Sequence, residues 1–170
     1  MWDEGRRAEP PVGSMPEDQL AGLAAVSLVA VVEQAYFSLQ VVYARRKHSV
    51  SPPATSGPPE FDRVYRAHVN CTEYFPIFLT VLWTAGLFFH QGVSSLCGLL
   101  YLYSRYCYFH GYRQSPQQRL APLYLGAKVL WALIGFSSLG VVCSLLRVYA
   151  GVDLVDLVFS CLTPDPTPDL

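Results

Sequence analysis

The sequence predicts an all-α integral membrane protein, built as an up-down bundle of four transmembrane helices. Of its 170 residues, 52% are hydrophobic and only 15% are charged, whereas a soluble domain usually has about 25% charged residues. Four long apolar stretches are separated by short segments rich in proline, glycine or basic residues. Stretches of this length can cross a bilayer as helices, and short connections make consecutive helices antiparallel neighbours.

Charge and cysteine usage exclude several other classes of protein. The net charge of -1 provides no strongly basic surface for nucleic acid. The five cysteines show no C-x-x-C spacing and mostly lie in apolar stretches, so they are interpreted as buried thiols and not as a disulfide framework. The histidines form no H-x-x-x-H pair, so no metal site is predicted.

The N-terminal part divides into a leader and a first span. Residues 1–16 are rich in proline, glycine and charge without apolar periodicity, so we expect a disordered leader, with Met15 as an alternative start. Residues 20–43 form the first apolar span. Glu33 and Gln34 lie near its middle and must face protein or water. Three basic residues end the span and anchor its topology: Arg45, Arg46 and Lys47.

The next two spans follow a stiff loop. Residues 49–59 contain two Pro-Pro pairs and cannot be helical. Residues 60–89 form the second span, in which Pro76 is a potential kink. Gln91 and Gly92 are predicted to form a tight turn before the third span, residues 93–112.

The fourth span is predicted to begin at a helix cap. Ser115, Pro116 and Gln118 have the residue types of N-cap, N1 and N3 positions. The span then runs to about residue 146, with Arg119 in its first turn. Residues 17–149 would form the transmembrane domain, and residues 150–170 a C-terminal tail too short to span. The basic loops after the first and third spans share one side, which the positive-inside rule places in the cytosol.

Two polar faces interrupt the apolar spans. At the start of the second span, a cation, an amide, a carboxylate and a phenol fall on one helix face: Arg66, Asn70, Glu73 and Tyr74. This set can hold a small zwitterionic ligand, or it can be a polar seam between packed helices. A second face runs up the third span: Tyr101, Arg105, Tyr108 and Tyr112. A stripe along one face favours a site over an interfacial belt of tyrosines.

The polar faces lie in runs of sequence that resemble a known family. EFDRVYRAHVNCTEYFPIFLTVLWTAGLFF, GLLYLYSRYCYFHGY and SPQQRLAPLY resemble the MAPEG superfamily of membrane glutathione transferases and eicosanoid proteins. The resemblance covers residues 15–149. It implies a homotrimer in the endoplasmic-reticulum and outer nuclear membranes. It further implies that glutathione binds between adjacent subunits and that its thiol is added to the epoxide of leukotriene A4.

The resemblance also implies a role for individual residues. Six residues of one subunit would hold glutathione: Arg66, Asn70, Glu73, Tyr74, Tyr108 and Tyr112. Ser38 and Arg45 would approach from the neighbouring subunit. Arg119 would stabilise the thiolate and Arg46 would assist opening of the epoxide. Trp131 would cap the lipid tail, and Tyr124 is assigned to the lipid substrate with it.

Charge supports glutathione as the ligand. Its two carboxylates and one ammonium need two cations and one anion, which Arg45, Arg66 and Glu73 provide. His68 stands where the family usually has glutamine. It lies about 200° around the helix from Arg66, so the two cannot line one pocket of the same chain. We expect only a small change in glutathione affinity from it. Glu33 replaces a usually apolar residue, and the sequence alone gives no physical account of it.

The sequence is also compared with what three other functions would require: a broader transferase, a scaffold and a transporter. A broad-specificity microsomal glutathione transferase or lipid peroxidase would use the same glutathione residues with other electrophiles. A non-catalytic scaffold that presents arachidonate would lack a productive glutathione site, against which the complete polar set argues. A channel or transporter is not supported, because no broken helix or inverted repeat is visible.

Overall fold

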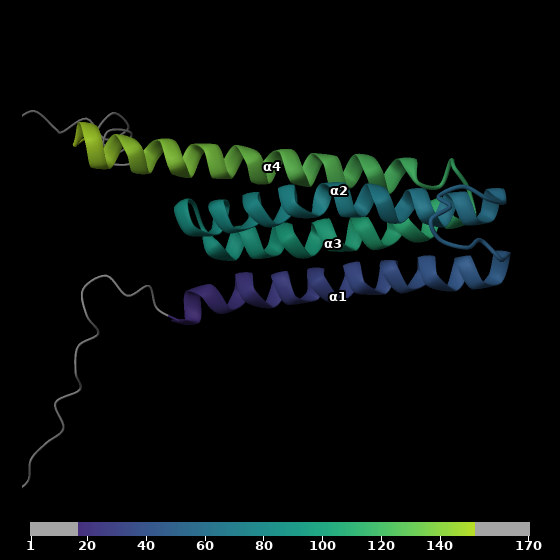
Figure 1. Ribbon diagram of the computed structural model, residues 1–170. Helices are drawn as coiled ribbons and strands as arrows, with labels where there is room; N and C mark the ends of the chain where they lie inside the picture. The colour runs from purple at the N-terminus through teal and green to yellow at the C-terminus, as the bar shows by residue number, and fades with distance from the viewer. Residues whose placement is uncertain (1–16, 152–170) are drawn as a thin grey trace, which may run out of the picture.

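The computed structural model describes residues 17–151, which form four long helices and one short π-helix (Figure 1). The long helices are α1 (Glu17–His48), α2 (Pro59–Phe88), α3 (Gln91–Gln114) and α4 (Leu120–Leu145), and the π-helix η1 (Leu146–Ala150) continues α4. The predicted leader, residues 1–16, and the tail from residue 152 onward lie outside the described residues. The expected domain boundaries therefore stay predictions.

The helices run antiparallel along the chain, with α2 and α3 in the middle. These two helices pack against each other, and each contacts α1 on one side and α4 on the other (Figure 1). The end of α1, the start of α2, the end of α3 and the start of α4 meet at the same end of the bundle. This end carries the basic last turn of α1 and is called the basic end below.

Three of the described helices are long and apolar enough to cross a membrane: residues Leu20–His48 of α1, Pro59–Phe88, and Leu120–Ala150. Their outer faces are apolar as well. Leu28 on α1 is 67% exposed, Ile77 on α2 46% and Trp131 on α4 71%, which suits a surface surrounded by lipid and not by water. The protein is thus a multi-pass membrane protein.

Two connections differ from the sequence prediction. The expected turn at Gln91 and Gly92 is wrong, because both residues already belong to α3. His90 caps this helix, and its Nδ1 accepts a hydrogen bond from the Val93 amide at 3.3 Å. The chain reverses at Phe89 and His90 instead.

The expected helix start at Ser115 is also wrong. The Ser115 amide donates to Gly111 O at 2.9 Å and so ends α3. Its hydroxyl donates to Oε1 of Gln117 at 2.7 Å and closes a local turn, which competes with a helical start. Helix α4 begins only at Leu120, and Arg119 is its N-cap residue, not a first-turn residue.

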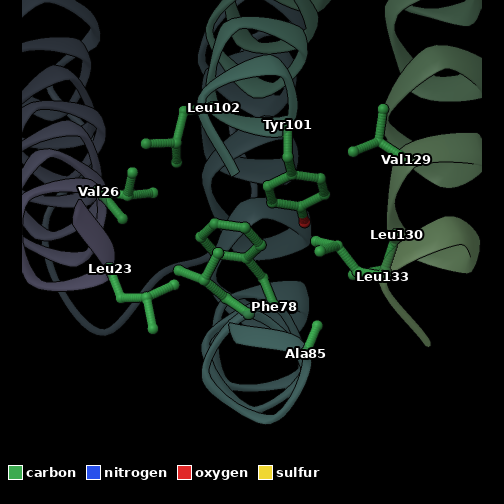
Figure 2. Packing of buried hydrophobic residues seen from close by; sticks show 11 residues of the cluster. Leu23, Val26, Phe78, Ala85, Tyr101, Leu102, Val129, Leu130 and Leu133 are labelled. Atoms are coloured by element: carbon green, nitrogen blue, oxygen red, sulfur yellow. The ribbon is translucent and has the colours of Figure 1, made fainter. Parts of the chain in front are cut away.

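Two apolar clusters fill the bundle, one towards each end. The Phe78 cluster joins all four helices, and Figure 2 shows Tyr101 inserted between α2 and α4 in it. The Phe109 cluster lies towards the basic end and contains Phe37, Phe61 and Tyr108. Along α1, Glu33 falls between the two clusters, as Tyr74 does along α2 and Arg105 along α3. The bundle therefore has a polar layer near its middle.

Helix α4 approaches the end of α2 through a glycine, which gives a test of the fold. A Cβ on Gly140 would lie 2.6 Å from the carbonyl carbon and oxygen of Phe88, whereas a Cβ on Gly135 would meet nothing within 4 Å. We expect Gly140→Ala to destabilise the protein by about 1–3 kcal/mol, since backbone atoms must move apart. Thermal unfolding in detergent measures this loss.

The matched control is Gly135→Ala on the same helix. Alanine has the higher helix propensity, so this change should be neutral or stabilising by up to about 1 kcal/mol. Equal midpoints for the two variants would contradict the close approach of α4 to α2.

Candidate functional site

Arg105 lies at the centre of the polar layer. Its side chain is only 6% exposed, and Nη2 donates to the backbone oxygen of Asn70 at 3.0 Å and to Oδ1 of Asn70 at 2.9 Å. Its guanidinium carbon lies 4.9 Å from the ring centroid of Tyr108 and 5.3 Å from that of Tyr74. A cation over aromatic faces is attracted by the ring quadrupole. Arg105 thus joins three predicted site residues from α2 and α3.

The arrangement continues towards the basic end along α3. The rings of Tyr108 and Tyr112 have centroids 5.8 Å apart. The guanidinium carbon of Arg119 lies 4.4 Å from the centroid of Tyr112. The Nε atom of Arg119 is buried and has no hydrogen-bond partner among the described residues. We call the six residues of this arrangement the tyrosine strip: Asn70, Tyr74, Arg105, Tyr108, Tyr112 and Arg119.

Two further predicted residues flank the strip on α2. Arg66 and Glu73 share a helix face with Asn70, and both side chains are exposed. Within residues 17–151, neither forms an ion pair or a side-chain hydrogen bond. An exposed cation and an exposed carboxylate beside buried phenols leave charges of both signs available to a ligand.

The predicted residues of α1 lie on the other face of α2. The Ser38 hydroxyl is 3.0 Å from Nε2 of His68. The guanidinium carbon of Arg45 lies 5.3 Å from the ring centroid of Phe61, and its Nη1 donates to Ala54 O at 2.7 Å. Phe61 and His68 are about 140–200° around α2 from Arg66. One chain therefore does not bring Ser38 and Arg45 together with the tyrosine strip.

The remaining predicted residues stand at the outside of the bundle. Arg46 is exposed in the last turn of α1 and lines, with Arg45, an open surface pocket of about 420 Å³. Tyr124 and Trp131 are 63% and 71% exposed and lie seven residues apart on one face of α4. Within the described residues, neither side chain forms a ring contact or a hydrogen bond with the strip of its own chain.

Sequence reasoning did not include Arg105 among the site residues, although it recognised the polar face on which Arg105 lies. The signal was a single cation among three tyrosines in an apolar stretch. It also missed the hydrogen bond from Gln34 Nε2 to Thr72 Oγ1, which joins α1 to α2 beside His68. Sequence spacing cannot show such contacts, because they depend on how two helices pack.

The strip has the chemistry of an anion-stabilising site. It offers two guanidinium groups and three phenols along a half-buried wall, and it holds no group of three or more metal-ligating side chains among the described residues. Guanidinium and phenol groups donate hydrogen bonds to anions such as carboxylates and thiolates. The surroundings of these groups have a lower dielectric constant than water, which strengthens the interactions.

Comparison with known proteins gives relatives that match about three quarters of the chain. A leukotriene C4 synthase from Bos taurus is 58% identical over 130 residues, which are 76% of this chain and 87% of that protein. The protein of the same name from Mus musculus is 60% identical over 124 residues, 73% of this chain and 83% of its own length. Microsomal glutathione S-transferase 2 from Homo sapiens is 42% identical over 132 residues, 78% of this chain and 90% of that protein.

The chain also matches the model of one protein family. The model of the MAPEG family matches residues 23–139. This range contains α2 and α3, most of α1 and α4, and every residue of the tyrosine strip. The resemblance found in the sequence is thereby confirmed, and this chain belongs to the MAPEG family.

Proposed function

We propose that the protein acts as a leukotriene C4 synthase, a membrane enzyme that conjugates glutathione to the epoxide of leukotriene A4. The relatives that carry this name support the reaction. The observation that carries the mechanism is the position of Arg119. Its guanidinium stands at the end of the tyrosine strip, and its buried Nε has no hydrogen-bond partner among the described residues.

Glutathione is the co-substrate that the charges of the site fit. Arg66 and Glu73 are exposed beside the strip and would pair with one carboxylate and the ammonium. Asn70, Tyr74, Tyr108 and Tyr112 would donate hydrogen bonds to the peptide. The second carboxylate needs another cation, and Arg45 is the candidate, with Ser38 beside it on α1.

Because Ser38 and Arg45 lie on the opposite face of α2, they would have to serve the tyrosine strip of a neighbouring subunit. This geometry supports a site shared between subunits, and we propose a homotrimer as the assembly. His68 lies on the Ser38 side and already contacts Ser38. It would thus meet glutathione across the subunit boundary and change the affinity only slightly.

Arg119 would act by electrostatic stabilisation. A free thiol has a pKa of about 8.5, so only a few per cent is thiolate at neutral pH. Lowering that pKa by about two units requires about 2.7 kcal/mol, which is within reach of a charge-assisted contact. The guanidinium cannot accept a proton, since it stays protonated below pH of about 12. The thiol proton would therefore leave to water.

The bond changes follow from this thiolate. The sulfur attacks one epoxide carbon, and the C–S bond forms as the C–O bond breaks. The oxygen becomes an alkoxide, which takes a proton from water. Arg46 would donate hydrogen bonds to the developing alkoxide, as an oxyanion donor does. Its exposed position at the end of α1 leaves it free to reach a substrate.

The lipid substrate would bind on the outside of the bundle. Tyr124 and Trp131 present their rings from one face of α4 into the region that lipid surrounds. An apolar epoxide dissolved in the bilayer can reach this face sideways, without crossing water. Trp131 would cap the end of the lipid tail, with Tyr124 nearer to the basic end.

The proposal also implies how the helices are oriented in the membrane. Helix α3 is antiparallel to α2 and α4 (Figure 1). At 24 residues it is about 36 Å long, so we propose that it crosses the membrane as a fourth span despite its polar face. The basic end would lie in the cytosol. The membranes proposed are those of the endoplasmic reticulum and the outer nuclear membrane.

A broad glutathione transferase or lipid peroxidase is the second candidate, favoured by the 42% identity to microsomal glutathione S-transferase 2. Turnover of leukotriene A4 against an aryl halide distinguishes the two. A non-catalytic scaffold predicts no glutathione binding, and titration of glutathione onto the protein in detergent tests that reading.

Replacing Arg119 tests the thiolate mechanism. We expect Arg119→Ala to slow conjugation at neutral pH by one to several orders of magnitude, since about 2–4 kcal/mol of charge stabilisation is lost. Activity should recover in part in alkaline buffer, because the pKa of the bound thiol returns towards about 8.5. Ultraviolet absorbance of the bound thiolate at pH 7 and the pH–rate profile measure both effects.

Glutathione binding should weaken less than turnover in this variant, because Arg45, Arg66 and Glu73 still match its charged groups. Arg113→Ala, on an exposed residue of the same end of the bundle, is the matched control and should keep the thiolate signal. An unchanged signal in Arg119→Ala would remove Arg119 from the chemistry and leave it as a topology anchor.

Mixing two inactive variants tests the shared site. If Arg45 and Arg66 serve one glutathione from different subunits, then co-expression of Arg45→Ala with Arg66→Ala should restore part of the activity through hybrid interfaces. In random trimers some interfaces carry both intact arginines. A mixture that is no more active than either variant alone, with mixed oligomers verified by two affinity tags, would show that the site is not shared.

A further inference from the structure

Arg105 is a buried cation, and its hydrogen bonds do not end at a group of opposite charge. Both recorded bonds use Nη2 and end at the neutral Asn70. Among the described residues, Arg63 pairs with Glu60, whereas Arg105 forms no ion pair with an acid. A guanidinium at membrane depth is costly unless an opposite charge is near, so the charge of Arg105 calls for a partner.

Glu33 is the carboxylate that faces Arg105 from α1. It lies in the polar layer at mid-helix, and the two groups interact electrostatically. Its Oε1 is buried and has no hydrogen-bond partner among the described residues. The outer side of Glu33 borders an open apolar groove between α1 and α3, where a carboxylate would face hydrocarbon. The inward direction is therefore the favourable one for its charge.

A small cavity connects the two side chains. Glu33 and Arg105 both line it, together with Gln34, Cys71 and Phe78, and its volume is about 20 Å³. A cavity of this size holds one water molecule when two or more polar groups bind it. The buried Oε1 of Glu33 can accept from such a water, which in turn can accept from an N–H group of Arg105.

We propose that Glu33 is the counter-charge of Arg105 and, through it, a positioning residue for Asn70 in the candidate site. The link runs from α1 through one water to Arg105 on α3 and on to Oδ1 of Asn70 on α2. Arg105 also lies over the rings of Tyr74 and Tyr108. Fixing the guanidinium thus fixes the wall of the tyrosine strip that the proposed function assigns to glutathione.

A double-mutant cycle on thermal unfolding in detergent, without glutathione, tests the pair directly. Glu33→Gln keeps the shape and removes the charge, so the unfolding midpoint should fall by about 4 °C or more. In an Arg105→Met background the sign should reverse, because the carboxylate is then unpaired and its removal relieves a buried charge. Glu60→Gln, on an exposed acid 3.8 Å from Arg63, is the control and should leave the midpoint unchanged.

Glutathione kinetics test the positioning role, which rests on the proposed function. Glu33→Gln should weaken glutathione binding about threefold to tenfold, a size typical of coupling between neighbouring groups, and kcat should change less than KM. The pairing would be contradicted if Glu33→Gln had the same unfolding midpoint as the wild type. It would also be contradicted if Glu33→Gln lowered the midpoint equally in both backgrounds. If the wild-type protein binds no glutathione, the proposed function fails, while the thermal cycle still decides whether Glu33 and Arg105 are paired.

Discussion

The structure depends on holding the Arg105 guanidinium in the middle of an apolar bundle. Three helices contribute to this. Asn70 on α2 accepts its hydrogen bonds, tyrosines of α2 and α3 supply aromatic faces, and Glu33 on α1 faces it across a cavity. An uncompensated cation at this depth would outweigh many apolar contacts. The polar layer therefore sets how the helices rotate about their axes, and the Phe78 and Phe109 clusters fill the space on either side of it.

Helix α2 shows how one helix can belong to two different sites. Its residues Phe61 and His68 face α1, whereas Asn70 and Tyr74 face α3 and α4. A ligand small enough to fit one face cannot reach the other within the same chain. If Arg45 and the tyrosine strip recognise one glutathione, the assembly must place α1 of one subunit against α2 of the next. The need for an oligomer, for which we propose a homotrimer, then follows from helix geometry and from the charges of the ligand, not from the size of any apolar patch.

The long apolar stretches and the four helices could be predicted from the sequence, because both depend on local composition and on proline-rich loops. The i, i+4, i+7 spacing also placed Asn70 and Tyr74 on one face correctly. The errors lie at the connections. His90 caps α3 with its side chain, and Ser115 bonds to Gln117 in a turn instead of starting a helix. The close contact of Gly111 with the carbonyl of Gln118 also holds that turn against α3, and such a constraint depends on tertiary packing.

The roles of Glu33 and Arg105 escaped prediction for the same reason, since two charges on separate helices reveal their pairing only when the helices are packed.

The reaction joins two substrates that prefer different solvents. One end of the bundle is placed so that both can reach it. Glutathione is charged and arrives from water, whereas the epoxide is apolar and arrives from the bilayer. Arg119 lies where α4 begins, beside the end of α3 and therefore near the membrane surface. Tyr124 and Trp131 extend from that point along the outer face of α4 into the lipid region.

A thiol held at Arg119 would be close enough to water to release its proton. The resulting thiolate would be close enough to hydrocarbon to lie in a medium of lowered dielectric constant, which strengthens its attraction to the guanidinium. A thiolate deeper in the bundle would lack an exit for the proton, and one farther out would lose the stabilisation to solvent. If Arg119 activates the thiol, as we propose, this boundary is the place on the fold where a single arginine can do so.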